Sequence, residues 1–280
     1  MGYFEGRKAV IATKHKKETV IAPWLELELG LICSTPENLN TDLFGTFSGE
    51  IERVDDPITT MKKKCLMAIE ATGISIAIAS EGSFGPHPAI FFANSNDELI
   101  MLYDQENDIE IIERELNLET NFDAAVVCSS EELIEFAKKI GFPSHGIILK
   151  KGKNDFSVII KQNSTFDDLL ENYIRIRDDY GVAYAETDMR AMFNPTRMKN
   201  IEKAAKKLIV KAKSLCPKCG IPGFGIVESV SGLPCEICHY PTNTTFKHIY
   251  RCLKCNQQAE LVYPFDKKFE NPQYCDRCNP

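Results

Sequence analysis

The sequence lacks any long apolar run, which excludes the commonest kind of membrane protein. No apolar stretch approaches the roughly 18 residues that a transmembrane helix needs. Residues 1–8 lead into a short apolar strand and lack the hydrophobic region of a signal peptide. Apart from a recurring Cys-x-x-Cys spacing, internal repeats and low-complexity linkers are also missing. We therefore expect a cytoplasmic globular protein without a membrane partner.

The sequence also lacks a strongly basic region outside one predicted helix, 199–213. The net charge is −7. From Ser214 onward, 7 Lys and Arg stand against 6 Asp and Glu. Eight thiolates and two Zn²⁺ ions would add −4, which leaves this segment mildly acidic. Such a balance disfavours a nucleic-acid partner, whose phosphates attract basic surfaces. A structural role or a protein partner for this segment fits the charge better.

Cysteine, in contrast, is abundant. Eight of the 11 cysteines form four Cys-x-x-Cys pairs. In a chain without an export signal this spacing favours metal binding over disulfides. The other three, Cys33, Cys65 and Cys128, lie in apolar or helical contexts and are expected to be buried thiols. The pairs are Cys216/Cys219, Cys235/Cys238, Cys252/Cys255 and Cys275/Cys278.

Two Cys-x-x-Cys turns complete a tetrahedral Cys₄ site, so four turns predict two zinc ions. A site closed by four protein ligands is structural and not catalytic. We favour sequential pairing, first with second and third with fourth. A nested arrangement, first with fourth and second with third, also fits. With eight cysteines present, His239 and His248 are expected not to bind the metal.

Hydrophobic periodicity predicts an α/β fold in three segments. Residues 1–162 alternate helices with parallel and hairpin strands, which indicates an α/β domain with a mixed sheet. Residues 163–213 read as a helical segment of two helices, 166–180 and 195–214, of which the second is the connector. Residues 214–280 form the double zinc ribbon, a small C-terminal module.

Two polar segments of the first domain carry more chemistry than a turn requires. Thr13, Lys14, His15 and Lys17 lie between a strand and the start of a helix, where a phosphate is favoured. The alternative is a solvated turn. The loop 41–53 is polar and long enough for function, and it offers Asp42, Thr46, Ser48, Glu50 and Arg53.

A third segment, 80–88, is expected to be a loop at the end of the strand 74–79. It contains Glu81, Ser83 and His87. Its glycines permit close approach of the backbone to a ligand. A carboxylate at this position can hold Mg²⁺ or act as a general base. The alternative is a tight structural turn.

Two arginines near the connector helix are the last candidates. Arg190 precedes the helix start at Asn194, and Arg197 lies in the first turn. Two guanidinium groups beside exposed amides suit a phosphate. Equally, they can pair with Glu186 and Asp188 as a clamp between segments.

The order of these motifs resembles that of the inosine/xanthosine triphosphate pyrophosphatases over about 85 residues. The shared features are the strand ending at Thr13-x-His15, a helix with Lys64-Cys65, Thr72-Gly73, and the strand leading to Glu81-Gly82-Ser83. The chain departs from that pattern where His15 replaces an asparagine, Glu18 a lysine and Ser80-Glu81 an acidic pair. The resemblance implies phosphoanhydride hydrolysis, with Lys64 among the ligand-binding residues.

Along its whole length the chain resembles an uncharacterised bacterial family, a domain of unknown function. The shared segments include Ala12–His15, Thr41–Glu50, Ser80–Pro88 and Glu186–Arg190, together with the zinc pairs. This resemblance implies the architecture and no activity.

We therefore favour a Mg²⁺-dependent hydrolase of a nucleotide or other phosphorylated small molecule. Lys14, His15, Lys17 and Arg190 would hold phosphates, and Glu81 with Glu50 or Asp42 would hold the metal. The alternative is a non-enzymatic domain that senses a ligand and relays its state to the zinc ribbon, which binds a protein or nucleic-acid partner.

Overall fold

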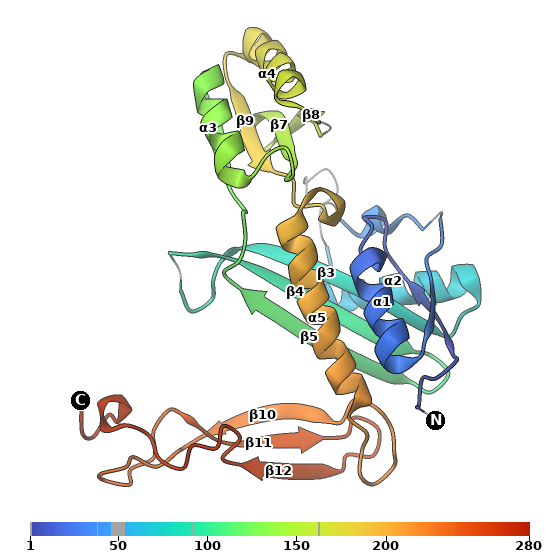
Figure 1. Cartoon of the computed structure of the whole chain (residues 1–280), viewed down its shortest axis with the longest axis vertical. Coiled ribbons are helices and arrows are strands. Elements are labelled where there is room, and N and C mark those ends of the chain that lie inside the picture. The colour runs from blue at the N-terminus through green and yellow to red at the C-terminus, as the bar shows by residue number, and fades with distance from the viewer. Residues whose placement is uncertain (1, 38, 46–53, 91, 162) are drawn as a thin grey trace. The chain divides into compact units, whose positions relative to one another are not determined.

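The computed structural model describes residues 2–37, 39–45, 54–90, 92–161 and 163–280. The chain divides into two compact units, Met1–Ile209 and Val210–Pro280. Figure 1 shows the helices and strands of both units. Within the described residues, no helix is both long enough and apolar enough to cross a bilayer.

The first unit contains a mixed five-stranded sheet in the order β2-β1-β3-β4-β5. Strands β2 and β3 pair with β1 in parallel, and β3, β4 and β5 form antiparallel pairs. Strand β1 therefore lies between its two parallel neighbours. The connection from β1 to β2 runs toward one edge of the sheet, and the connection from β2 to β3 runs back across β1. The elements are β1 (Lys8–Ile11), α1 (Glu18–Leu29), β2 (Ile32–Ser34), η1 (Thr41–Phe44), α2 (Pro57–Thr72), β3 (Ile76–Pro86), β4 (Asn94–Asp104) and β5 (Ile109–Asn117).

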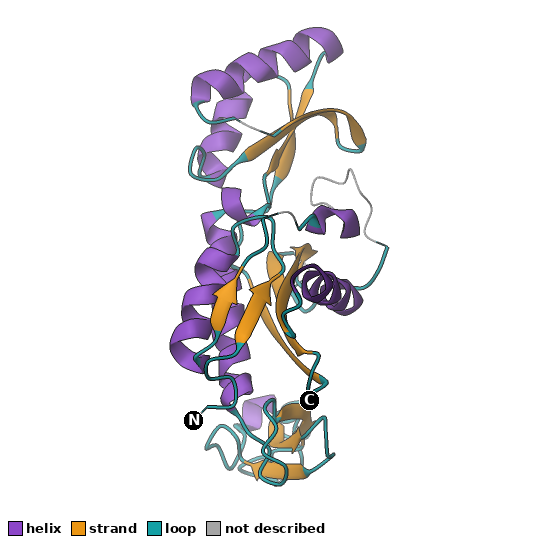
Figure 2. Ribbon diagram, turned by 90° about the vertical axis from the view of Figure 1, so that its right-hand side faces the viewer, coloured by secondary structure: helices purple, strands orange, loops and turns teal. Residues whose placement is uncertain are grey.

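Helices cover both faces of this sheet (Figure 2). Helix α2 packs its residues Met61 and Cys65 against alternate residues of β3 and β4. Its ends follow local signals: the Asp56 side chain accepts two backbone N–H groups, and Gly73 takes the left-handed conformation at the other end. Helix α1 lies on the opposite face, where Trp24 donates a hydrogen bond of 3.1 Å to Glu202 of α5 (Pro195–Lys213).

A second sheet of the same unit is four-stranded and antiparallel, in the order β6-β9-β7-β8. Its apolar core packs against α3 and α4, which lie on one face in Figure 1. Within the described parts of the chain, no helix covers the other face of this sheet (Figure 2). The elements are β6 (Ala124–Val127), α3 (Ser130–Ile140), β7 (Ile147–Gly152), β8 (Asp155–Ile160), α4 (Phe166–Tyr180), β9 (Ala183–Thr187) and η2 (Ala191–Phe193).

Strand β9 lies in the segment for which the sequence predicts helices alone. It enters between β6 and β7, so these two parallel strands are not neighbours in the sheet. Its alternating residues Ala183 and Ala185 are fully buried in the core of α3 and α4. Five residues between two helices are too short a pattern to distinguish from a loop, and the strand forms because two neighbours supply its hydrogen bonds.

The second unit is built on a three-stranded antiparallel sheet, β10-β11-β12. Its strands are β10 (Gly225–Ser231), β11 (Thr245–Arg251) and β12 (Gln258–Val262), followed by the 3-10 turn η3 (Pro272–Tyr274). The four Cys-x-x-Cys turns lie outside the strands, at their ends.

Candidate functional site

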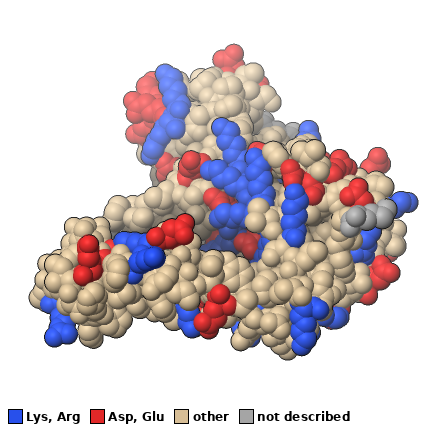
Figure 3. Space-filling view, turned by 60° about the horizontal axis from the view of Figure 1, so that its bottom comes forward, with Lys and Arg blue, Asp and Glu red and all other residues tan. Residues whose placement is uncertain are grey.

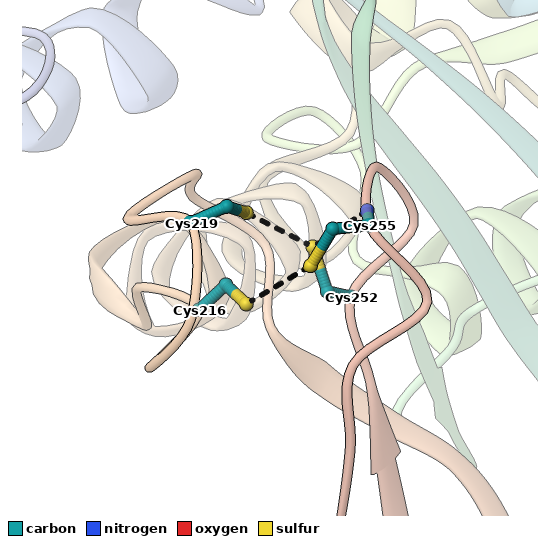
Figure 4. Close-up of side chains that lie close together, drawn as sticks. All are labelled: Cys216, Cys219, Cys252 and Cys255. Carbon is teal, nitrogen blue, oxygen red and sulfur yellow. Dashed lines mark hydrogen bonds between the residues drawn. The ribbon is translucent and has the colours of Figure 1, made fainter.

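The eight paired cysteines form two separate quartets in the second unit. One consists of Cys216, Cys219, Cys252 and Cys255, and the other of Cys235, Cys238, Cys275 and Cys278. In each quartet the four sulfur atoms lie within 4.8 Å of one another. Figure 4 shows the first quartet, contributed by two loops that face each other.

The sulfur spacing matches a tetrahedral metal site. The distances between Sγ atoms are 3.6 Å for Cys216–Cys255 and Cys219–Cys252. A Zn–S bond of about 2.3 Å gives a tetrahedral edge of about 3.8 Å. A disulfide, at about 2.05 Å, would be far shorter. Each quartet can therefore hold a metal ion with all four coordination positions filled by protein.

The quartets interleave along the chain, so both the sequential and the nested pairing predicted from the sequence are wrong. The first Cys-x-x-Cys pair joins the third, and the second joins the fourth. Strand direction is the cause. Gly225 of β10 pairs with Arg251 of β11, and Arg251 pairs with Gln258 of β12. The loop before β10 and the loop between β11 and β12 therefore meet at the same end of the sheet.

The opposite end of that sheet carries the second quartet for the same reason. The β10–β11 connection holds Cys235 and Cys238, and the segment after β12 holds Cys275 and Cys278. Neither His239 nor His248 belongs to a quartet. Their rings instead contact Phe269 and Phe265 edge to face.

The three remaining cysteines differ in exposure. Cys65 lies on the face of α2 that packs against the first sheet, and burial raises the pKa of its thiol to about 12. Cys33 is only partly buried, and Cys128 is exposed. The prediction of a buried thiol is therefore wrong for Cys128, which follows β6 at the point where the chain turns toward α3.

In the first unit, charged residues gather beyond the carboxyl end of β1. Lys17 is buried at the start of α1, where its Nζ donates hydrogen bonds to the backbone oxygen (3.0 Å) and Oγ (2.9 Å) of Ser80. Burial and the nearby Arg197 guanidinium lower the Lys17 pKa to about 7. Open α/β sheets bind ligands at this place, where the strand order switches direction.

The neighbouring segment, Ser80 to Pro86, continues strand β3 and is not the loop predicted from the sequence. The antiparallel partner β4 extends it, because every residue of β3 from Ile76 to Pro86 has a counterpart on β4. Glu81 is buried on this strand and forms an ion pair with Lys64 of α2. Lys64 and Glu81, which are both predicted site residues, therefore neutralise each other's charge.

Arg197 also serves a different purpose from the predicted phosphate contact. It is fully buried, and its Nε lies 2.7 Å from Oε1 of the equally buried Glu98. Gly82 is required beneath this pair, since a Cβ there would lie 2.6 Å from both side chains. Arg197 donates a further hydrogen bond to the backbone oxygen of Met189. It thereby ties α5 and the segment after β9 to the first sheet.

His15 and Asp42 form a second polar group at the same end of β1. The His15 Nε2 lies 3.1 Å from Asp42 Oδ1, and Lys14 Nζ lies 2.6 Å from Oδ2. Burial, together with the charges of Lys17 and Arg190, lowers the His15 pKa to about 4, against the opposing effect of Asp42. His15 is therefore neutral at pH 7. Thr13 Oγ1 accepts the backbone N–H of His15 and supports this turn.

Arg190 lies near enough to influence His15 and is paired with Asp188, at 2.6 Å between Nη2 and Oδ2. The clamp alternative includes this ion pair, but Arg190 and Asp188 are two residues apart, so the pair by itself does not join separate segments. Arg197 differs, since Glu98 and not Glu186 is its partner.

Among the described candidates, His87 is not part of this cluster. His87 caps a turn after β3, where its Nδ1 accepts two backbone N–H groups. Seven residues of extended chain separate it from Ser80, about 20 Å. Thr46, Ser48, Glu50 and Arg53 lie outside the described residues.

The magnesium site predicted from Glu81 with Glu50 or Asp42 stays a prediction, because Glu50 lies outside the described residues. Among them, the two cysteine quartets are the groups of three or more His, Cys, Asp or Glu side chains close enough to share a metal. Asp42 and Glu81 each have a cationic partner instead.

A cavity of about 390 Å³ adjoins the cluster and was not foreseen from the sequence. It lies between the part of β3 that extends beyond its pairing with β1 and the face of the second sheet opposite α3 and α4. Its lining includes the predicted residue Ser83 together with Phe84, Phe122, Tyr184 and Glu186. These residues come from distant segments, so only the fold brings them together. The buried Glu98 was missed too, although a glutamate directly before an apolar strand pattern is a usable signal.

Basic residues of α5 have acidic neighbours. Lys203 lies 2.5 Å from Glu119, and Lys207 lies 2.6 Å from Glu115. On the face shown in Figure 3, Lys and Arg side chains gather near the middle with Asp and Glu side chains beside them. This mixture of charges is not the continuous basic surface that binds nucleic acid.

Comparison with known families gives one match. A family model described as a domain of unknown function (DUF6671) matches residues 64–280. Since this range covers well over half of the chain, the chain belongs to that family, which confirms the predicted membership of an uncharacterised family. The matched range includes Lys64, Glu81, Arg197 and both cysteine quartets. A search of curated proteins finds no match.

Proposed function

We propose that the first unit of this family member binds a phosphorylated small molecule beyond the carboxyl end of β1. The observation that carries the proposal is the environment of Lys17. Its hydrogen-bond acceptors among the described residues are two neutral oxygens of Ser80, although the amino group is buried. A buried cation normally lies in contact with an anion. A bound phosphate would supply an anion in direct contact with this amino group.

The surroundings of Lys17 favour the same ligand. Arg190 and the start of α1 add positive potential at this point. The exposed Lys14 extends it toward solvent. The carboxylates Glu81 and Glu98 are each paired with a cation, as Arg190 and Lys14 are paired with Asp188 and Asp42, so among the described groups of this cluster Lys17 has no carboxylate in direct contact. The site is therefore better suited to an anion than to Mg²⁺ alone.

Calorimetric titration with inorganic phosphate, pyrophosphate and nucleoside triphosphates tests this proposal. Loss of a charge-assisted hydrogen bond in Lys17→Met should weaken binding by roughly 10- to 100-fold. Lys16→Met is the matched control, because Lys16 is the exposed neighbour in the same turn. Equal affinities for the wild type and both variants would refute the assignment.

Hydrolysis of the bound ligand is a second candidate function, favoured by the contact between His15 and Asp42. A carboxylate that accepts the Nε2 proton of a neutral histidine leaves Nδ1 free to accept a proton from water. Phosphate or pyrophosphate release from nucleoside triphosphates with Mg²⁺ measures this activity. Equal background rates in wild type and His15→Ala would exclude hydrolysis at this site. Binding without turnover would then support the sensor function.

For the second unit, we propose that the two metal ions are structural zinc. Four thiolates in tetrahedral arrangement are the usual ligands of such zinc. With no coordination position left for water or substrate, the metals hold loops together and take no part in the chemistry of the first unit.

A further inference from the structure

The cavity between β3 and the second sheet has the composition of a site for an aromatic ring. Its volume of about 390 Å³ falls within the range of small-molecule sites. Three aromatic side chains line it: Phe84, Phe122 and Tyr184. The rings of Phe84 and Phe122 stack with their centroids 5.8 Å apart, which fixes one wall. Tyr184 lies on the opposite element, β9.

Polar groups at the same cavity can form hydrogen bonds with the edge of a ring. Glu186 lies two residues after Tyr184 on the same face of β9, and its Oε2 is 2.7 Å from Nζ of the buried Lys150. A carboxylate has two acceptor oxygens, so Glu186 can also accept an N–H group from a ligand. Burial raises the Glu186 pKa. The side chain of Asn154, on the β7–β8 turn, also lines the cavity and offers both donor and acceptor atoms.

Two chain segments connect this cavity to the Lys17 cluster. On β3, Ser80 and Glu81 belong to the cluster, whereas Ser83 and Phe84 line the cavity. Three residues of strand span about 10 Å. After β9, Met189 lines the cavity and the next residue, Arg190, acts on His15. The two sites are therefore adjacent, at the separation of the two ends of a nucleotide.

We propose that this cavity binds the base of a nucleotide whose phosphate lies at Lys17 and Arg190. The inference rests on the proposed phosphate site and names its ligand class. Tyr184 and Phe122 provide aromatic surface for stacking, and Glu186 accepts an N–H group from the base. Base stacking on aromatic side chains is a common mode of nucleotide recognition because every base has a π face.

Calorimetric titration of the full chain with four nucleoside monophosphates and with ribose 5-phosphate tests the inference. The wild type should bind at least one nucleotide roughly tenfold more tightly than ribose 5-phosphate, as expected for one stacked base. Tyr184→Ala should remove that advantage without changing the affinity for ribose 5-phosphate. Tyr184→Phe, which keeps the ring, should retain it. Tyr180→Ala is the control, because Tyr180 is exposed at the end of α4.

A second variant tests the polar contact. Glu186→Gln keeps an oxygen for Lys150 but adds an N–H donor, so it should change the order of preference among the four nucleotides. An unchanged order together with an unchanged Tyr184→Ala affinity would overturn the base assignment.

The outcomes separate this inference from the proposed function. Equal affinities for ribose 5-phosphate and all nucleotides, each weakened by Lys17→Met, would refute the assignment of the cavity to the base and leave the proposed phosphate site intact. Nucleoside binding that depends on Tyr184 but not on Lys17 would overturn the joint site, because the phosphate would then lie elsewhere.

Discussion

The buried pair Arg197–Glu98 should dominate the stability of the first unit. Both side chains are fully buried, and Nε and Oε1 are 2.7 Å apart. Arg197→Met leaves the Glu98 carboxylate without its partner, and removal of one member of a buried pair costs about 3–5 kcal/mol. For a unit of this size each kcal/mol lowers Tm by about 2–4 °C. We expect Tm to fall by roughly 10 °C.

Trp24 makes the measurement specific to this unit. It is the single tryptophan of the chain and contacts Glu202 of α5. Its fluorescence therefore follows thermal or urea unfolding of the first unit without a signal from the second. Arg114→Met is the matched control. Arg114 pairs with Asp97, the residue before Glu98, but is about half exposed, so its loss should cost at most about 1 kcal/mol.

A double-mutant cycle isolates the pair itself. Glu98→Gln removes the carboxylate charge, so the double variant with Arg197→Met should be more stable than the sum of the two losses by about 0.5–3 kcal/mol. Additive losses, or a cost of Arg197→Met no greater than that of Arg114→Met, would refute the reasoning.

Two further predictions concern the metals and Lys17. Cys216→Ser and Cys252→Ser should each reduce bound zinc from two ions to one, and the two combined should reduce it no further, because both residues belong to one quartet. Cys216→Ser combined with Cys235→Ser should leave no bound zinc. Elemental analysis measures the zinc content, and sequential pairing predicts the reverse for the two double variants. The Lys17 pKa, lowered to about 7 chiefly by burial, means that the unfolded chain binds more protons between pH 7 and about 10.5. The free energy of unfolding, measured by Trp24 fluorescence, should therefore rise with pH across that window. Phosphate affinity should fall as pH rises through 7. A Lys17→Met variant that keeps the same pH dependence would contradict both predictions.

The sequence predicts the local elements well where their signals are local. Helix α2 follows from Asp56-Pro57 at its start and Gly73 at its end, and both act within one turn of the helix. The cap at Thr165 and the glycine at 181 define α4 in the same way. Such signals do not depend on the rest of the fold.

Features that depend on distant segments were beyond prediction. The four Cys-x-x-Cys turns offer equivalent ligands, so only the strand directions of the sheet decide which pairs meet. Glu81 reads as a loop residue because its strand pattern ends at Ala79, and the pairing with β4 extends the strand. Of the predicted site, the structure brings Lys14, His15, Lys17, Asp42 and Arg190 together, because the end of β1 and the segment after β9 approach each other.

The interleaved quartets also affect how the second unit is made. The first quartet joins residues 39 apart in the chain, from Cys216 to Cys255, and the second joins residues 43 apart, from Cys235 to Cys278. These two loops overlap, so a chain emerging from the ribosome cannot close its first metal site before Cys255 is made, nor its second before Cys278. A fragment ending after the second Cys-x-x-Cys turn would carry four cysteines and still lack a native site. The smallest unit that can be duplicated or exchanged between proteins is therefore the whole double site, because half of it has no independent fold.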